Sequence, residues 1–278
     1  MCAERTAWLV AAALVVTPAW ADDSGAPSLQ SCLKQLRSSR RVEREEATTC
    51  LAGLAKENQE ARRALIRVLK DRDPSVRAAA ASQLTTLGPA AEDAVPALIA
   101  ALADEDGWVV EWAIKALAQI GPPAIPALEA ALPTHHAAAA RALGAIGPPA
   151  LPALIRALEN PKVRGPATAG IEAMGRQAAP ALPALVAGLK DPNPGMRSVM
   201  LRALHALGRS AAPAVPALLA ALDDPERYVR VDALGVLEAI GPEAAQAVPK
   251  LWEMSRDEKL DRQTRMNAEL ALKKIQGR

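Results

Sequence analysis

The sequence has almost no aromatic residues: its 278 positions include no phenylalanine, one tyrosine and five tryptophans. Half of the residues are nonetheless hydrophobic, so the core must be built from alanine, leucine, valine and isoleucine. Small and aliphatic side chains of this kind suit helices that pack closely against one another. The composition therefore favours a helical protein of one large domain or two small ones.

An excess of charge of either sign is also absent. The 33 Lys and Arg residues are almost balanced by 31 Asp and Glu residues, which leaves a formal net charge of +2. This balance gives no general electrostatic reason to expect nucleic acid or an anionic membrane as a partner. We therefore expect no nucleic acid as the partner.

The sequence lacks a hydrophobic run long enough to span a bilayer, which needs about 20 residues. Its longest early run covers residues 7–16 and ends shortly before a small-x-small site. This layout is typical of a secretory signal peptide, which we predict for residues 1–21 with cleavage after Ala21. A hydrophobic helix of the fold is the alternative. The signal peptide predicts a periplasmic or secreted protein, with a short linker at 22–27, a folded domain at 28–278 and no membrane insertion of the mature chain.

The chain contains an internal repeat of about 30 residues. An aliphatic residue followed by Gly recurs with the same period as a second marker, the tripeptide Pro-Ala-Leu and its variant Pro-Lys-Leu. Copies of the tripeptide begin at Pro96, Pro126, Pro152, Pro183, Pro216 and Pro249. Because both markers advance together, we expect the same structural unit to be stacked several times.

Each unit has the pattern of two helices. The proline of Pro-Ala-Leu stands in the first turn of the first helix, where a missing N–H is tolerated. In the second helix, apolar residues recur with helical spacing, as they do from Val229 to Ile240. Gly241 then ends that helix and Pro242 prevents its continuation. The segment from Ala145 to Leu158 is therefore expected to be a joint between units.

An Asp in the turn and an Arg six residues later recur in several units. The pairs are Asp71 with Arg77, Asp191 with Arg197, and Asp224 with Arg230. Stacking would place them in a column, where each Arg reaches the Asp of its own or an adjacent unit and hydrogen-bonds turn backbone groups. Because the feature repeats with the architecture, we interpret these carboxylates as structural rather than catalytic.

The combination of an aliphatic residue, Gly and Pro with Pro-Ala-Leu, a turn Asp and its Arg resembles HEAT repeats. The short, alanine-rich units are similar to the HEAT-like repeats named after the phycobilisome (phycocyanobilin) lyases. This resemblance covers residues 28–276 and implies an all-α, right-handed α-solenoid of about eight helical hairpins, with second helices lining the inner face. The fourth unit departs from it by being short, with His135 and His136 near the expected Arg, and the fifth by having Pro166 early in its second helix.

Cysteine is rare, and Cys32 and Cys50 follow the predicted signal peptide. Alignment of the first two units places a turn near Arg40 and Arg41. The two cysteines are equally far from that turn, so antiparallel helices would hold them at the same height. In an oxidising compartment we predict a disulfide worth about 3 kcal/mol. Two small buried thiols are the alternative.

Residues for catalysis or metal binding are scarce. The three histidines are not followed by Glu, and no HExxH, CxxC, G-x-S-x-G or glycine-rich phosphate loop is present. His135 and His136 are neighbours that would point about 100° apart on a helix. We therefore expect no metal, no cofactor and no enzymatic activity. A HEAT-like lyase or chromophore-handling enzyme is the alternative that the resemblance raises.

The second helix of the third unit carries a candidate binding surface. Trp108, Trp112 and Lys115 share one helical face. Arg141 is the equivalent of Lys115 in the next unit. Trp and Arg are the residue types most enriched in binding hot spots. The sequence therefore predicts that a protein or peptide docks here.

The same inner face continues into the sixth unit, where Arg202 corresponds to Lys115 and His205 lies one turn further on. A purely structural role is the alternative for both tryptophans. Trp108 would then pack under the inter-helix turn, and Trp112 would fill space beside a small alanine. We expect packing for Trp108 and leave both interpretations open for Trp112. Together these features predict an exported, non-enzymatic scaffold that binds its partner on a concave face.

Overall fold

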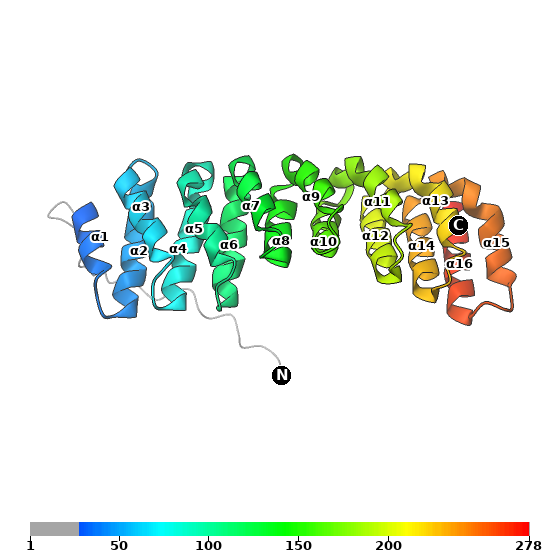
Figure 1. Cartoon of the computed structure of the whole chain (residues 1–278), viewed down its shortest axis with the longest axis horizontal. Coiled ribbons are helices and arrows are strands. Elements are labelled where there is room, and N and C mark those ends of the chain that lie inside the picture. Colours follow the sequence, from blue (N-terminus) through cyan, green and yellow to red (C-terminus); the bar gives the residue numbers. More distant parts are fainter. Residues whose placement is uncertain (1–27, 278) are drawn as a thin grey trace, which may run out of the picture.

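The computed structural model describes residues 28–277, which form a single elongated stack of helices (Figure 1). Within these residues there are eight antiparallel helical hairpins, connected by short 3₁₀ segments in most of the joints, and no β-strand. The hairpins are numbered 1 to 8 in chain order. Their helices are α1 (Leu29–Gln35) with α2 (Arg41–Ala55), α3 (Gln59–Val68) with α4 (Pro74–Leu87), α5 (Val95–Ala101) with α6 (Gly107–Ile120), α7 (Ile125–Ala131) with α8 (His136–Ile146), α9 (Leu151–Ala157) with α10 (Arg164–Met174), α11 (Leu182–Gly188) with α12 (Pro194–Leu207), α13 (Val215–Ala221) with α14 (Arg227–Ile240), and α15 (Val248–Arg256) with α16 (Arg262–Ile275).

The joints between hairpins form as the repeat pattern predicts. The α8 helix ends at Ile146, and Gly147 follows with φ of 85°, a left-handed value that favours glycine. A 3₁₀ turn over Pro148–Ala150 leads directly into α9, whose Pro152 lies in the first turn. The proline and glycine of this joint reverse the chain direction, so the sequence prediction for it is confirmed.

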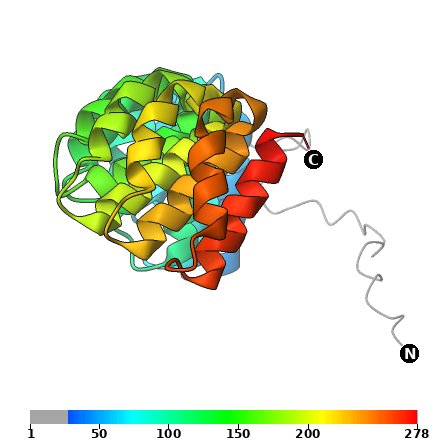
Figure 2. The same cartoon turned by 90° about the vertical axis from the view of Figure 1, so that its right-hand side faces the viewer.

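The two helices of each hairpin occupy different sides of the stack. Consecutive second helices, from α2 to α16, pack directly against one another, whereas consecutive first helices contact each other much less. The second helices therefore lie closer to one another than the first helices do, and the stack curves toward the side of the second helices. Figures 1 and 2 show the two layers from the side and end-on. We call the side of the second helices the concave face, in agreement with what the resemblance to HEAT repeats implied.

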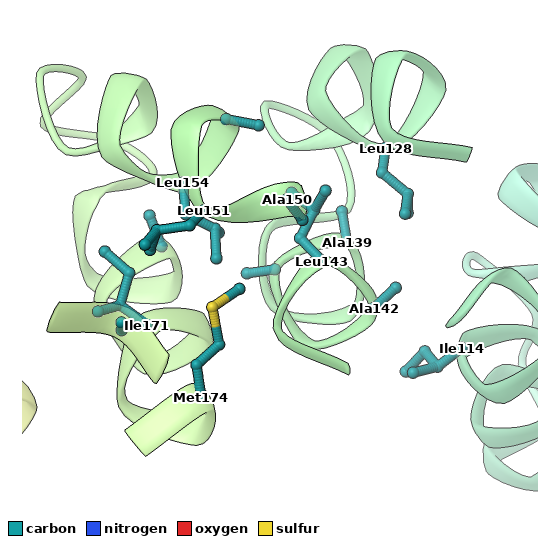
Figure 3. Close-up of a cluster of buried hydrophobic side chains, with 14 of the residues drawn as sticks. Ile114, Leu128, Ala139, Ala142, Leu143, Ala150, Leu151, Leu154, Ile171 and Met174 are labelled. Carbon is teal, nitrogen blue, oxygen red and sulfur yellow. The ribbon is translucent and has the colours of Figure 1, made fainter. Parts of the chain in front are cut away.

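The core is continuous along the stack and consists of alanine and aliphatic residues. Figure 3 shows a central part, where Leu128, Leu143, Leu154 and Ile171 fill the space between neighbouring hairpins. All four side chains are fully buried. The scarcity of aromatic residues is thus explained by a layer in which helices approach each other closely. No helix among the described residues is long and apolar enough to cross a membrane.

An Arg–Asp ladder joins neighbouring hairpins along the turns. It comprises the ion pairs Arg44–Asp71, Arg77–Asp104, Arg164–Asp191 and Arg197–Asp224, each with a separation of 27 residues. The Arg77 guanidinium, for example, donates to both Asp104 carboxylate oxygens at 2.7 Å and to the Asp71 carbonyl oxygen at 2.9 Å. Each ladder Arg therefore ties the turn of its own hairpin to the Asp of the next one.

The ladder sharpens the sequence prediction of Asp–Arg pairs. Of the two options, the structure selects the adjacent unit for the carboxylate and the same unit for the backbone carbonyl. Arg230 follows only half of this scheme: it donates to the Asp224 carbonyl oxygen at 2.7 Å, but its Nε atom is buried without a partner. Asp257, which lies 27 residues further on, is exposed.

The middle of the stack, at the interfaces of hairpin 4 with hairpins 3 and 5, has no rung of this ladder. Val110 and His136 occupy the Arg positions there, and α8 and α10 have 11 residues where most second helices have 14. At the interface of α8 and α10 the backbones come very close. A Cβ atom added to Gly170 would lie 2.7 Å from the Ala140 carbonyl oxygen, and one added to Gly144 would lie 2.8 Å from the Gly170 carbonyl oxygen.

The two cysteines lie side by side on α1 and α2, at the first hairpin. Their Cα atoms are 6.0 Å apart, a separation that a disulfide spans, and both side chains are buried. The turn between these helices falls just before Arg41, as expected from the alignment. The predicted position of the pair is confirmed, and formation of the bond remains a prediction. The predicted signal peptide and linker lie outside the described residues.

Candidate functional site

The candidate site is built on α6, which exposes an aromatic side chain to solvent. Asp106 caps this helix by accepting hydrogen bonds from the backbone N–H groups of Trp108 and Val109 at 2.9 and 3.2 Å. Trp108 thus stands in the first turn, and 70% of it is exposed. The expectation that Trp108 packs under the inter-helix turn is wrong, because the turn residues do not cover it. Tyr228, at the equivalent position of α14, is also exposed.

Trp112 lies one turn further along α6 and is only partly exposed. Its ring packs against the hydrophobic core, so the space-filling interpretation describes part of its surface. The Lys115 ammonium group lies over the ring, 4.3 Å from its centroid. This cation–π contact holds an exposed positive charge beside an aromatic surface.

An ion pair borders these residues on the side of hairpin 4. The Arg141 guanidinium on α8 donates to both Glu111 carboxylate oxygens on α6, at 2.6 and 2.8 Å. These hydrogen bonds lower the pKa of Glu111, and burial opposes the change only in part. The side chains of Arg141 and Glu111 are 53% and 38% exposed, so solvent screens the pair and it stabilises the fold by only about 0–1 kcal/mol. We call the surface formed by Trp108, Trp112, Lys115 and Arg141 the tryptophan patch.

The other two predicted residues do not join this patch. Arg202 and His205 are exposed on α12, three second helices away from α6, beside a separate hollow between α12 and α14. The six residues predicted for the concave face therefore form two separate groups on that face, which we call stations. The first station is the tryptophan patch, and the second is the hollow with Arg202 and His205. Glu111, at the patch, and Glu172, at the hollow, were not predicted. An alignment of the second helices that scored charge at every exposed position would have found them.

Both stations consist of aromatic, imidazole and charged side chains at the surface. Within residues 28–277, no group of three or more His, Cys, Asp and Glu side chains is arranged to hold a metal ion. His135 and His136 lie at the start of α8, where His135 is the N-cap residue and makes no side-chain capping hydrogen bond. The patch instead offers one exposed indole ring, one half-buried ring and charged groups at their edges.

Two family models match this sequence. The model for HEAT repeats matches residues 86–137 and 182–273, which together make up more than half of the chain. The model for the PBS lyase HEAT-like repeat matches residues 136–160, in hairpins 4 and 5. Together the matches span residues 86–160 and 182–273, which include the shortened unit of hairpin 4 and the regular units of hairpins 3, 6 and 7. No match was found among the curated proteins.

Three solved structures with a similar arrangement of helices are distant in sequence. A chain from the structure in which Kap95p binding induces the switch loops of RanGDP to adopt the GTP-bound conformation is 14% identical. It matches over 88% of this chain and 41% of its own length, with a TM-score of 0.52, which shows the solenoid fold.

Two further structures align over most of both chains. The complex of CpcE and CpcF of phycocyanin lyase from a Nostoc species is 24% identical over 90% of this chain and 96% of its own, with a TM-score of 0.39. A computationally designed armadillo repeat protein for modular peptide recognition is 20% identical over 89% and 100%, with a TM-score of 0.40.

Proposed function

The chain belongs to the HEAT-repeat family, and we propose that it is a non-enzymatic scaffold that binds a protein or peptide partner on its concave face. Stacked repeats present an extended surface of similar shallow sites, which suits macromolecular partners better than small substrates. The observation that carries the proposal is the 70% exposure of Trp108. A large indole ring left in water on the concave face gains stability when a partner covers it.

The neighbours of Trp108 support the same role. Lys115 and the Glu111–Arg141 pair border the aromatic surface with charged groups, as the polar rim of an interface does. Such a rim selects partners by charge while the rings supply affinity. The partner is a protein or peptide rather than nucleic acid, because the net charge of the chain is only +2.

The proposal also includes export of the protein from the cytoplasm. The apolar run at residues 7–16 and the small residues before Asp22 support a cleavable signal peptide, so the scaffold would act in the periplasm or outside the cell. Sequencing the N-terminus of the protein purified from its natural host tests this point. A first residue of Asp22 supports cleavage after Ala21, and an uncleaved Met1 contradicts it.

A comparison of variants in envelope extract tests the binding site. The protein and its Trp112→Ala plus Arg141→Glu variant are used as baits, and recovered proteins are compared by mass spectrometry. A matched control, Trp252→Ala plus Arg67→Glu, removes an exposed tryptophan and reverses an exposed arginine on the first helices α15 and α3. We expect the concave variant to lose a partner that the wild type and the control retain. Equal recovery by all three would reject the tryptophan patch.

A lyase-type, chromophore-handling activity is a second candidate function. The match of residues 136–160 to the PBS lyase HEAT-like repeat favours it. The purified protein can be mixed with a linear tetrapyrrole and followed by absorption spectroscopy. A spectral shift of the pigment that saturates at a 1:1 ratio would support this candidate over the scaffold, and an unchanged spectrum would reject it.

A further inference from the structure

A hollow on the concave face opens between α12 and α14, with a volume of about 300 Å³. Its walls are formed by Glu172 from α10, by three residues of α12 and by three of α14: Leu201, Arg202, His205, Val231, Asp232 and Gly235. Gly235 opens the hollow because it has no side chain there; a Cβ atom at this position would lie 3.8 Å from His205 Cδ2. Any larger residue would fill the space beside the imidazole.

Three of the four ionisable side chains around this hollow are unpaired, unlike those of the tryptophan patch. In the described part of the chain, Glu172, Arg202 and His205 make no side-chain hydrogen bond or ion pair with one another or with other residues. Asp232 differs, because it accepts a hydrogen bond from the Ser198 hydroxyl. Glu172 and Arg202 thus stand on neighbouring helices with opposite charges and without partners. A ligand that carries both signs of charge would complement them.

Between the two stations, much of the concave face is formed by small side chains. The exposed residues of α8 and α10 there include Ala145, Ala169 and Ala173, which project little from the helices. The larger side chains on these two helices include Arg141, at the tryptophan patch, and Glu172, at the hollow, and beyond them stand Trp108 and Trp112 on α6 and Arg202 and His205 on α12. A backbone can therefore lie along this floor and place its side chains in both stations.

We infer that the partner contributes an extended peptide segment that crosses the concave face from α6 to α12. This inference rests on the proposed function. Neighbouring packed helices lie about 8–10 Å apart, and an extended chain advances about 3.3 Å per residue. In this peptide, one apolar side chain contacts the tryptophan patch. A basic residue that faces Glu172 then lies about five or six residues away along the peptide. An acidic residue facing Arg202 and His205 comes about seven to nine residues from the apolar anchor.

A phage-displayed library of random twelve-residue peptides, selected on the purified protein, tests the inference. Selected peptides are synthesised, and their affinities are measured by fluorescence anisotropy. We expect them to share an apolar anchor with a basic and then an acidic residue at the stated distances. Arg202→Glu should weaken their binding about tenfold or more, because it replaces a charge-assisted contact by a repulsive one. Arg67→Glu, the same charge change on α3, should leave the affinity unchanged.

A charge-swapped variant separates this inference from a general electrostatic effect. Glu172→Arg combined with Arg202→Glu keeps the net charge and should prefer peptides in which the basic and acidic residues are exchanged. If Trp108→Ala plus Trp112→Ala abolishes binding but Arg202→Glu does not change it, the second station is rejected and the proposed function stands. If no peptide is enriched above background, an extended peptide partner is rejected, and the extract experiment alone decides whether a folded partner binds.

Discussion

Two kinds of interface hold the repeats together, and they differ in their chemistry. Toward the ends, hairpins 1 to 3 and 5 to 7 are linked by the Arg–Asp ladder, whose charged groups are mostly covered. In the middle, hairpin 4 has only exposed ion pairs, Glu111–Arg141 and Glu129–Arg156, and one side depends on the close approach of Gly144 and Gly170. A ladder rung needs an Arg in the first turn of one second helix and an Asp in the turn of the next hairpin; Val110 and His136 stand at the Arg positions on the two sides of hairpin 4.

The largest effect is expected from removing one side of a ladder rung. Arg77→Ala leaves the Asp104 carboxylate, which is 12% exposed, without its ion-pair partner. Breaking a buried pair in this way costs about 3–5 kcal/mol. Arg156→Ala is the matched change in the middle, where the arginine is 60% exposed and the pair is worth about 0–1 kcal/mol. Urea unfolding measures the free energy of unfolding of both variants. Equal losses of stability would show that the two kinds of interface do not differ.

The second prediction concerns the first hairpin, where the ladder is supplemented by the two cysteines. Reduction of a Cys32–Cys50 disulfide should lower the free energy of unfolding by about 3 kcal/mol. The loss should be absent in a Cys32→Ser plus Cys50→Ser variant, whose stability already lacks the bond. Thiol titration of the denatured protein in its predicted mature form, which begins at Asp22 and so lacks Cys2, counts the free thiols without reductant, and two free thiols would contradict the bond.

The middle interface should be sensitive to a single methyl group. Gly170→Ala places a Cβ atom against the Ala140 carbonyl oxygen and should cost about 1–3 kcal/mol as the two helices are forced apart. Gly53→Ala, inside α2 and with no atom of a neighbouring element within 4 Å of the added group, should stabilise by about 0.5–1 kcal/mol. If both variants unfold at the same urea concentration, the close approach of α8 and α10 is not a real constraint.

The smallest effect is expected from acid. Hydrogen bonds from Arg77 lower the pKa of Asp104 below its ordinary value of 3.8. The folded state therefore binds this proton less readily, and the contribution of the rung is present above the ordinary pKa and lost as the pH falls through the lowered one. Wild type should lose more stability between pH 5 and pH 2 than Asp104→Asn. Parallel curves for the two proteins would contradict a role of the rung in acid sensitivity.

The same comparison shows what the sequence could predict. Local rules predict the repeat period and the proline and glycine joints. They also predict that Cys32 and Cys50 lie opposite each other on the two helices of the first hairpin. The Asp–Arg pairs were found by their separation within a unit, so the rungs through Arg44 and Arg164 escaped notice because neither has an Asp six residues earlier. Asp104 was missed because Val110 stands where its Arg would be.

The binding surface was less predictable, for a physical reason. Helical spacing places Trp108 and Trp112 on one face, but exposure depends on what the neighbouring turn covers, and the pattern does not contain that information. The same holds for the hollow beside Gly235, which exists only because α12 and α14 pack at a particular distance. Glu172 becomes relevant only once that hollow is known.

Site-specific photocrosslinking tests the binding face most directly. A benzophenone amino acid replaces Trp108 or Arg202 on the concave face, and Arg67 or Trp252 on the first helices, and each protein is irradiated in envelope extract. We predict that positions 108 and 202 crosslink to the same partner and that positions 67 and 252 do not. Crosslinks from positions 67 or 252 alone would show that the partner binds on the other side and would contradict a concave binding site.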